Sequence, residues 1–171
     1  MSVDFFMRPT LEAARELLGK RLFFKGKYGY ISETEAYVGQ DDPASHAARG
    51  KTPRNAPMFY RGGFSYVYFI YGMYYCINIV TERENFPSAV LIRGLVAKES
   101  AAKTDGPGKL ARYLGVTTAH SGIDLTQADD FFVAEGISLS DDKVERTPRV
   151  GIRVGLEKPW RFLVKDKNFL A

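Results

Sequence analysis

The stretch from Ile31 to Gly39 constrains the fold of this chain most strongly. Small or apolar residues alternate in it with acidic and aromatic ones, and a period of two is typical of a β-strand. As a strand, it places two sets of side chains on opposite faces: Glu33, Glu35 and Tyr37 on one, and Ser32, Thr34 and Ala36 on the other. A carboxylate that enters the interior costs free energy unless it is paired or used in chemistry. The two glutamates are therefore either structural ion-pair partners or part of a site.

Two pairs of segments predict β-hairpins. Arg21–Lys25 and Tyr28–Val38 have strand-like patterns, and Gly26 between them permits a tight turn. A second hairpin is predicted where Tyr71-Gly72 joins two aromatic runs, Phe64–Ile70 and Met73–Val80, because the glycine can adopt a positive φ. We expect short strands in four further segments: Ser88–Val96, Val133–Ser138, Val150–Val154 and Trp160–Val164.

Three segments carry helical signals. Thr10 has the position of an N-cap before apolar residues at helical spacing, and Gly19 ends this element. Gly106–Gly115 is expected to form a short helix, and Leu125–Phe132 a second one. Helices mixed with hairpin-linked strands predict an α+β fold. We expect a single domain over residues 1–171, with a mainly antiparallel, hairpin-rich β-sheet and a few flanking helices.

The segment Gln40–Gly63 has the composition of a loop, with three prolines, three glycines and few aliphatic residues. A loop of this length in a compact domain is usually either functional or disordered, and its His46 and Phe59 argue against disorder. Basic side chains in this loop, and one at a predicted helix start, either contact phosphates or form a solvated charged surface: Arg49, Lys51, Arg54, Arg61 and Lys109.

Composition restricts the class of protein. The net charge of +4 is compatible with a polyanionic partner without requiring one. The single cysteine, Cys76, cannot form a disulfide within the chain, which favours a reducing compartment. With one cysteine and two histidines, the sequence gives no support for a zinc site, and we expect no metal site. We find no signal peptide and no membrane-spanning run, so we expect a cytoplasmic protein.

Eight segments together form a pattern of defined order and spacing: Glu33–Tyr37, His46, Thr52–Asn55, Tyr66–Asn78, Val90–Arg93, Gly106–Leu110, Arg149–Ile152 and Lys158–Phe162. This pattern resembles that of the alkyladenine (3-methyladenine) DNA glycosylase family. The resemblance runs from Leu11 to Val164, which is nearly the whole chain. The combination of ETEAY, TPRN and YGMYYCIN is far more specific than a lone glycine motif. The chain is similar to the compact bacterial members.

The resemblance implies a monofunctional base-excision repair enzyme. Such an enzyme flips a damaged purine out of duplex DNA and hydrolyses its N-glycosidic bond, leaving an abasic site. Family substrates include 3-methyladenine, 7-methylguanine, hypoxanthine and ethenoadenine, and the family needs no metal or organic cofactor. The implied partner is double-stranded DNA that contains damaged purines, with no membrane involved. Nothing in the sequence demands more than a monomer, and we expect a protein of the bacterial cytoplasm that is associated with the nucleoid.

The resemblance also assigns roles to individual residues. Glu35 matches the general base that activates the attacking water. The side chain of Arg93 and the main-chain carbonyl of Val150 match the groups that hold this water. Tyr71 matches the tyrosine that fills the gap in the DNA helix, and Asn78 matches an asparagine that screens normal guanine. The side chains that sandwich and read the flipped base are matched by Tyr37, His46 and Tyr68.

The residue types suit this chemistry. One carboxylate can both orient a water molecule and stabilise an oxocarbenium-like transition state. Glu33 and Glu35 on one face would repel each other, which can raise the pKa of one of them. Arg93 is a lone cation in an apolar strand and is expected to pair with a buried carboxylate, for which Glu35 is a candidate. Glu33 receives no role from the resemblance and is interpreted as a structural or pKa-tuning neighbour.

Two other functions fit the same residues. One is a damage-binding protein that flips bases without cleaving them, and the other is a hydrolase of free nucleosides. Aromatic side chains attract cationic alkylated purines, although core packing is the alternative role for Tyr68 and Asn78. An exposed tyrosine at a hairpin tip, as expected for Tyr71, can wedge into a base stack or can be a surface residue without a role.

Overall fold

The computed structural model describes residues 1–99 and 101–170. Within them, eight strands form one sheet, and its main path runs in the order β3-β4-β5-β2-β1-β6. The described strands are β1 (Arg21–Phe24), β2 (Lys27–Val38), β3 (Ser65–Ile70), β4 (Tyr74–Val80), β5 (Ser88–Ala97), β6 (Phe131–Ala134), β7 (Val144–Thr147) and β8 (Arg161–Val164). Each of their pairings is antiparallel. The predicted α+β fold with a mainly antiparallel sheet is confirmed.

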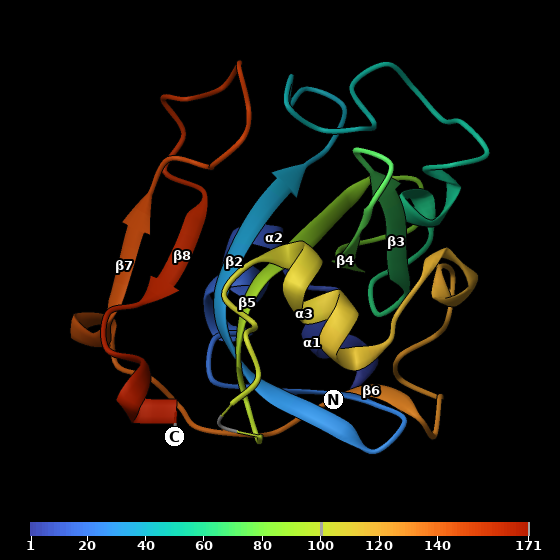
Figure 1. The fold of residues 1–171 in the computed structure, drawn as a ribbon. Coiled ribbons are helices and arrows are strands. Elements are labelled where there is room, and N and C mark those ends of the chain that lie inside the picture. The colour runs from blue at the N-terminus through green and yellow to red at the C-terminus, as the bar shows by residue number, and fades with distance from the viewer. Residues whose placement is uncertain (100, 171) are drawn as a thin grey trace.

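Helices flank this sheet, as Figure 1 shows. The α-helices are α1 (Val3–Phe6), α2 (Thr10–Glu16) and α3 (Pro107–Leu114). Helix α2 packs on β2 and β5, and α3 packs on β4 and β5. Short 3-10 turns complete the described structure: Ala56–Phe59, Thr118–His120, Asp141–Lys143 and Lys167–Leu170. Among residues 1–99 and 101–170, no helix is long and apolar enough to cross a membrane.

Strand β2 is the centre of the sheet, because it pairs with three other strands. One edge pairs with β5 along most of its length, and the other edge pairs first with β1 and then with β8. The register with β5 shifts on both sides of Glu33, which is the mark of a local bulge. Beyond the bulge, Glu35 lies opposite Leu91 of β5 and Arg161 of β8. Glu35 therefore lies in the interior of the sheet, with a neighbouring strand on each side.

The opposite face of β2 belongs to the hydrophobic core. Ser32, Thr34 and Ala36 are completely buried, and the Thr34 hydroxyl donates to the carbonyl of Ala14 in α2 at 2.9 Å. This bond satisfies a polar group that would otherwise cost free energy in the core. The contact of Thr34 with α2 and the place of Ala36 in the core agree with the predicted alternation, which the register shift at Glu33 interrupts before Thr34.

Both predicted hairpins are present, and each turns on two residues with positive φ. Tyr71 and Gly72 have φ values of 55° and 66° at the tip between β3 and β4, and Lys25 and Gly26 have 47° and 81° between β1 and β2. Two successive positive φ angles match the twist of the flanking strands. A tyrosine at such a position is uncommon. Its side chain is also 77% exposed, so the tip presents a large aromatic ring to solvent.

Two predicted elements are wrong. Leu125–Phe132 is not a helix: Asp124 accepts hydrogen bonds from the backbone and hydroxyl of Thr126, which favour a turn, and strand β6 begins at Phe131. Val150–Val154 is not a strand either. It is part of a loop in which Gly151 and Gly155 have φ values of 76° and 69°, and these angles do not fit an extended strand.

Other predicted boundaries need smaller corrections. The strand expected over Val133–Ser138 lies earlier, at Phe131–Ala134, where it pairs with β1. Strand β7 was not predicted, because its VERT sequence has a single aliphatic residue. Thr10 is the first residue of α2 and not its N-cap. Its backbone N–H and hydroxyl both donate to the carboxylate of Glu82, at 3.0 and 2.5 Å, so a distant side chain caps this helix.

Candidate active site

A cavity of about 510 Å³ lies beside the acidic face of β2. Its walls come from β2, the β3–β4 hairpin, β5, the start of α3 and two loops, Gln40–Gly63 and the segment that follows Arg149. Figure 1 shows both loops beyond the end of β2, where they rise above the sheet. Cavities of this size commonly hold small organic groups. Most of the predicted site residues line it: Tyr37, His46, Tyr68, Tyr71, Asn78, Arg93, Lys109 and Val150.

Glu35 lies directly behind the cavity wall, with its side chain fully buried. Its Oε1 accepts a hydrogen bond from the backbone N–H of Val150 at 2.7 Å, and Oε2 accepts one from the hydroxyl of Tyr37 at 3.0 Å. The Nε of Arg93 is 3.5 Å from Oε1. These three neighbours line the cavity, whereas Glu35 is not itself a lining residue. The carboxylate is therefore in direct contact with three residues of the cavity wall.

The surroundings of Glu35 shift its proton equilibrium. Burial raises the pKa of Glu35, and the Arg93 cation, the Val150 N–H and the Tyr37 hydroxyl offset this effect only in part. Burial and the nearby carboxylate also raise the pKa of Tyr37, so its hydroxyl stays protonated as a donor. A buried carboxyl group with a raised pKa can exchange a proton near neutral pH, as a general base must.

Arg93 pairs more closely with Glu33 than with Glu35. Its Nε donates to Glu33 Oε1 at 2.9 Å, and the Nε of Arg161 donates to the same oxygen at 2.7 Å. The expected pairing of Arg93 with a buried carboxylate is therefore present, but Glu33 is the nearer partner. Burial alone would raise the pKa of Glu33, yet the two arginines outweigh it and the pKa is lowered. Glu33 is ionised where Glu35 titrates.

Aromatic rings surround one side of the cavity. The rings of His46 and Tyr68 are 4.5 Å apart between centroids, at an interplanar angle of 68°. His46 Nδ1 is hydrogen-bonded to the hydroxyl of Tyr66 at 2.9 Å. Desolvation and the nearby Arg54 cation lower the pKa of His46, so it is neutral at physiological pH. Sequence analysis assigned no role to Tyr66, which fixes the orientation of the histidine ring.

Asn78 occupies the floor of the cavity. It is buried, and its side-chain amide donates to the carbonyl of Tyr66 at 3.0 Å. The neighbouring Cys76 also lines the cavity, and burial raises the pKa of its thiol. The thiol is therefore protonated, as is typical of a free cysteine in a buried position. Among the described residues, no three His, Cys, Asp or Glu side chains form a group that could hold a metal ion.

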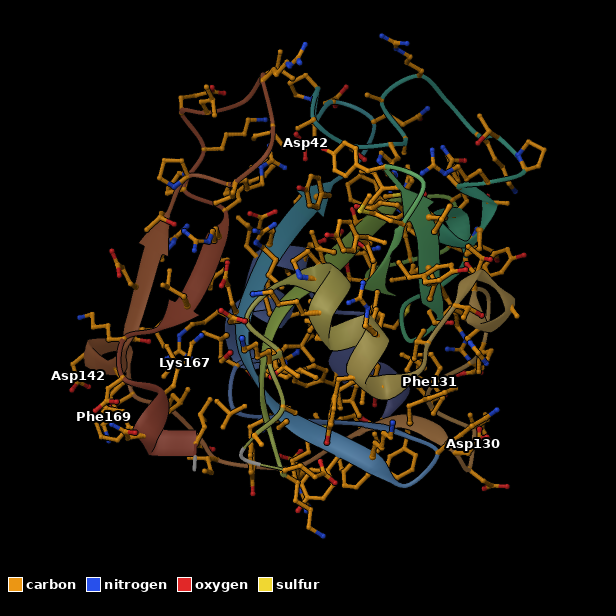
Figure 2. All side chains as sticks on the ribbon, in the orientation of Figure 1. Asp42, Asp130, Phe131, Asp142, Lys167 and Phe169 are labelled. Atoms are coloured by element: carbon orange, nitrogen blue, oxygen red, sulfur yellow. The ribbon has the colours of Figure 1, made fainter. Side chains whose placement is uncertain are left out.

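A buried ion pair joins the two loops that border the cavity. Arg149 donates to both carboxylate oxygens of Asp42, at 2.6 and 2.9 Å, and to the carbonyl of Ala36 at 3.0 Å. Its guanidinium lies between the rings of Tyr37 and Trp160, 4.8 and 5.0 Å from their centroids. Figure 2 shows Asp42 just beyond the end of β2. The pair holds the backbone next to Val150 and so fixes the N–H that contacts Glu35.

Comparison with known proteins assigns the chain to a family. The sequence profile of the methylpurine-DNA glycosylase family matches residues 4–168. The chain belongs to this family. A protein of Sodalis glossinidius is 55% identical over 163 residues, which are 95% of either chain. A protein of Ehrlichia chaffeensis is 52% identical over 170 residues, 98% of this chain and 94% of its own. Both are provisionally named 3-methyladenine DNA glycosylase.

The family assignment made from the sequence motifs is confirmed, and DNA-repair glycosylase is the class of protein to which the chain belongs. The motifs that identify the methylpurine-DNA glycosylase family surround the cavity. They come from segments as distant as Glu33 and Arg161, and the fold brings them together. Membership does not assign roles to the individual side chains, which follow from their geometry below.

The basic residues that were predicted to contact DNA lie in different settings. Lys109 lines the cavity and is paired with Asp105 at 3.0 Å, and Arg49 is exposed. The guanidinium of Arg54 lies over the Tyr68 ring and donates to the carbonyl of Phe69 at 2.9 Å. The remaining two are engaged elsewhere: Lys51 with the ring of Phe59, and Arg61 with the carboxylate of Asp124 at 2.6 Å.

Three residues that shape the site were not predicted from the sequence: Asp42, Arg149 and Arg161. Asp42 was one acidic residue in a polar loop, and Arg149 was noted only as a neighbour of Val150. Arg161 was part of the motif Lys158–Phe162 without a role of its own. A sequence pattern gives no sign of partners 107 or 128 residues away. The sequence offered one signal: Arg149 directly precedes Val150, and Arg161 lies within the motif Lys158–Phe162.

Proposed function

We propose that this protein is a base-excision repair enzyme of duplex DNA. It flips alkylated or deaminated purines out of the helix and hydrolyses the N-glycosidic bond with an activated water molecule, leaving an abasic site. The observation that carries the proposal is the buried Glu35 carboxyl, whose pKa is raised and which contacts three residues that line a cavity with aromatic walls. The whole chain acts as one glycosylase domain.

Glu35 is the general base in this proposal. Ionised Glu35 takes a proton from water as the water oxygen bonds to C1′, and the bond from C1′ to the purine nitrogen breaks so that the purine leaves with the bonding electron pair. The negative charge of Glu35 stabilises the oxocarbenium-like sugar. Arg93 is 3.5 Å from the carboxylate through its Nε and also lines the cavity, where its guanidinium can hold the water. The backbone N–H of Val150 fixes Oε1, and its carbonyl is proposed as a further contact to the water.

The aromatic walls support recognition of damaged purines. N-alkylated purines are cationic and electron-poor, and they gain from contact with the faces of aromatic rings. Tyr37, His46 and Tyr68 are proposed to sandwich the flipped base, with the neutral histidine as a hydrogen-bonding partner. Asn78 on the cavity floor is proposed to exclude substituents of normal guanine, because its amide is held in one orientation by the backbone.

The hairpin tip supports a duplex as the substrate. Tyr71 borders the cavity, is largely exposed and stands on a two-residue turn, so its ring can enter the gap that a flipped base leaves. Five basic side chains are proposed to contact phosphates: Arg49, Lys51, Arg54, Arg61 and Lys109. The ion pair with Asp124 makes Arg61 the weakest of these candidates. The free protein is proposed to bind as a monomer, without a metal or organic cofactor.

The decisive experiment is a base-release assay. Duplexes that carry 3-methyladenine, hypoxanthine or ethenoadenine are incubated with the wild type and with Glu35→Gln in the presence of EDTA. We expect the wild type to release the damaged base and to leave an uncut abasic strand, as a monofunctional enzyme does. Glu35→Gln should bind the same duplexes and release no base. Wild-type protein that binds damaged duplexes without releasing a base would instead be a damage-binding protein.

A second assay separates a duplex glycosylase from a hydrolase of free nucleosides. Tyr71→Ala removes the proposed wedge, and Tyr60→Ala removes another exposed tyrosine that does not line the cavity. A stacked aromatic contributes about 1–3 kcal/mol to nucleic-acid binding, so Tyr71→Ala should weaken activity on duplexes while Tyr60→Ala should not. Equal activity of both variants on duplex DNA, together with hydrolysis of free nucleosides, would favour the nucleoside hydrolase.

A further inference from the structure

Glu33 occupies a position that the proposed chemistry leaves unexplained. Its Oε1 accepts hydrogen bonds from two arginines on different strands, Arg93 of β5 at 2.9 Å and Arg161 of β8 at 2.7 Å. Its side chain is only 15% exposed. Glu33 therefore holds a nearly buried carboxylate at the junction of three strands, on the same face of β2 as Glu35.

The contact with Glu33 determines how Arg93 faces the cavity. In the part of the chain that the structure describes, the hydrogen bond of Arg93 to protein runs from Nε, as does its ion pair with Glu35. Arg93 lines the cavity, so its two terminal nitrogens are left for a molecule bound there. An arginine that is held by Nε presents its remaining donors in a fixed fork.

Arg161 balances the charge of this group. If Arg93 were the only arginine bound to Glu33, the carboxylate would attract Arg93 more strongly and draw it away from Glu35. A second cation on the same oxygen lowers this pull, while Arg161 is itself steadied by the hydroxyl of Thr147 on β7 at 3.2 Å. The hairpin of β7 and β8 thus contributes to the site, although its strands do not line the cavity.

A purely structural role explains the arrangement less well. If the pair served only to join β8 to β2, the backbone ladder between Glu33–Glu35 and Arg161–Leu163 would already do so. The register of β2 shifts on both sides of Glu33, and a side chain on Gly94 opposite would meet Glu33 at 3.2 Å. Bulges of this kind re-aim side chains near active sites. Here the bulge directs Glu33 to the Nε of Arg93.

We propose that Glu33, balanced by Arg161, is a positioning residue that orients the guanidinium of Arg93 toward Glu35 and the bound substrate. This inference rests on the proposed glycosylase function. Glu33 does not touch the reacting atoms and acts through Arg93. Its loss should therefore slow the chemical step and leave the affinity for DNA unchanged.

The experiment measures single-turnover release of hypoxanthine from a duplex as a function of pH. Glu33→Gln keeps the size and one acceptor oxygen but removes the charge. We expect the rate to fall about 10- to 100-fold, as for a misplaced catalytic group, with a duplex Kd within about twofold of wild type. Glu33→Asp keeps the charge and should recover part of the rate. The matched control is Glu135→Gln, which removes an exposed ion pair with Lys20.

The pH profile is a readout that a simple loss of folded protein would not move. The groups that face Glu35 are Arg93 from β5, Tyr37 and Glu33 from β2, and the N–H of Val150. The charge of Glu33 raises the pKa of Glu35, so its removal lowers this pKa. The acid limb of the profile should move to lower pH in Glu33→Gln and stay in place in Glu135→Gln.

Each outcome supports or overturns the inference. Wild-type protein that releases no base overturns the proposed function and the positioning role with it. Active wild type together with a Glu33→Gln variant of unchanged rate and unchanged acid limb overturns the positioning role alone. If Glu33→Gln does not fold, Arg161→Gln tests the same arrangement from the more exposed side. It should also slow the chemical step at unchanged Kd, and an unchanged rate overturns the role.

Discussion

Thr34 and Glu35 are neighbours on strand β2 and are both completely buried, but their polar groups are satisfied in different ways. Thr34 on the core face is completely buried and bonds to one backbone carbonyl, that of Ala14, 20 residues earlier. Glu35 on the cavity face is also completely buried, and its three partners come from β2, β5 and a loop 115 residues later. Thr34 is satisfied by one neutral hydrogen bond, whereas Glu35 depends on three groups from different parts of the chain, of which Arg93 is charged.

This difference separates a group that only stabilises the fold from a group that can also take part in proton transfer. A neutral hydrogen bond to the backbone stabilises the fold and has no second state. Burial of a carboxyl group disfavours its charged form and raises its pKa, which is a cost to stability and brings the group closer to the range in which it can transfer protons. Substitutions on the core face should therefore change stability and leave the rate per folded molecule unchanged, whereas those on the cavity face should lower the rate per folded molecule.

The largest expected effect is on the rate of Glu35→Gln. Loss of a general base lowers a rate by about 10²- to 10⁴-fold, which single-turnover base release should show. Because the substitution removes a buried ionisable group, the free energy of unfolding should stay equal or rise. A variant that loses activity only in proportion to a loss of folded protein would contradict the assignment of Glu35 to chemistry.

The second effect is on the stability of Thr34→Val. The substitution keeps the volume of the side chain and leaves the carbonyl of Ala14 without its donor, which should cost about 1–3 kcal/mol in the free energy of unfolding. Denaturant titration measures this cost, and the exposed Thr118→Val is the control. The rate per folded molecule should remain that of wild type. A slower rate at full folding would show that the two faces are coupled.

The third effect is the pH dependence of the wild type. The base must be ionised, so the rate falls as pH falls through the pKa of Glu35. Because burial raises this pKa, the midpoint of the acid limb should lie above the value of about 4.3 for a free glutamate. A rate that stays constant down to that value would place the titrating group elsewhere.

The smallest effect is expected for Tyr37→Phe, which keeps the ring and removes the donor to Glu35 Oε2. One hydrogen bond contributes about 0.5–1.5 kcal/mol, so the rate should fall roughly 2- to 10-fold. The lost donor stabilised the ionised carboxylate, and the acid limb should therefore move to higher pH, opposite to Glu33→Gln. Movement to lower pH would mean that Tyr37 does not act on Glu35 through this bond.

The sequence predicted local features of the fold well. Turn residues with positive φ located both hairpins, and the period of two in β2 separated its two faces. It failed where partners are distant. Strand β7 forms only because β8 lies beside it, and the apolar run Val150–Val154 became a loop because its backbone is held by other elements. Propensity alone does not decide either case.

The candidate site was predictable in its members but not in its connections. The motifs predicted that Glu35, Arg93 and Val150 belong to one site. In the structure, Val150 is within hydrogen-bond distance and Arg93 within ion-pair distance of the Glu35 carboxylate. The division of Arg93 between two carboxylates depends on the register shift at Glu33, which a sequence pattern does not encode. The ion pair of Asp42 and Arg149 was missed for the same reason.

The ion pair of Asp42 and Arg149 affects the order in which the parts of the site are completed during synthesis. Asp42 meets Arg149 across 107 residues, and Glu35 meets Val150 across 115. During synthesis, the hairpin tip and the aromatic side chains of the cavity leave the ribosome well before these partners. A nascent chain shorter than 149 residues would therefore contain the surface proposed to meet DNA and lack Arg149 and Val150, which hold the carboxylate and its surroundings. The proposed hydrolytic centre would be completed last, with the final part of the chain.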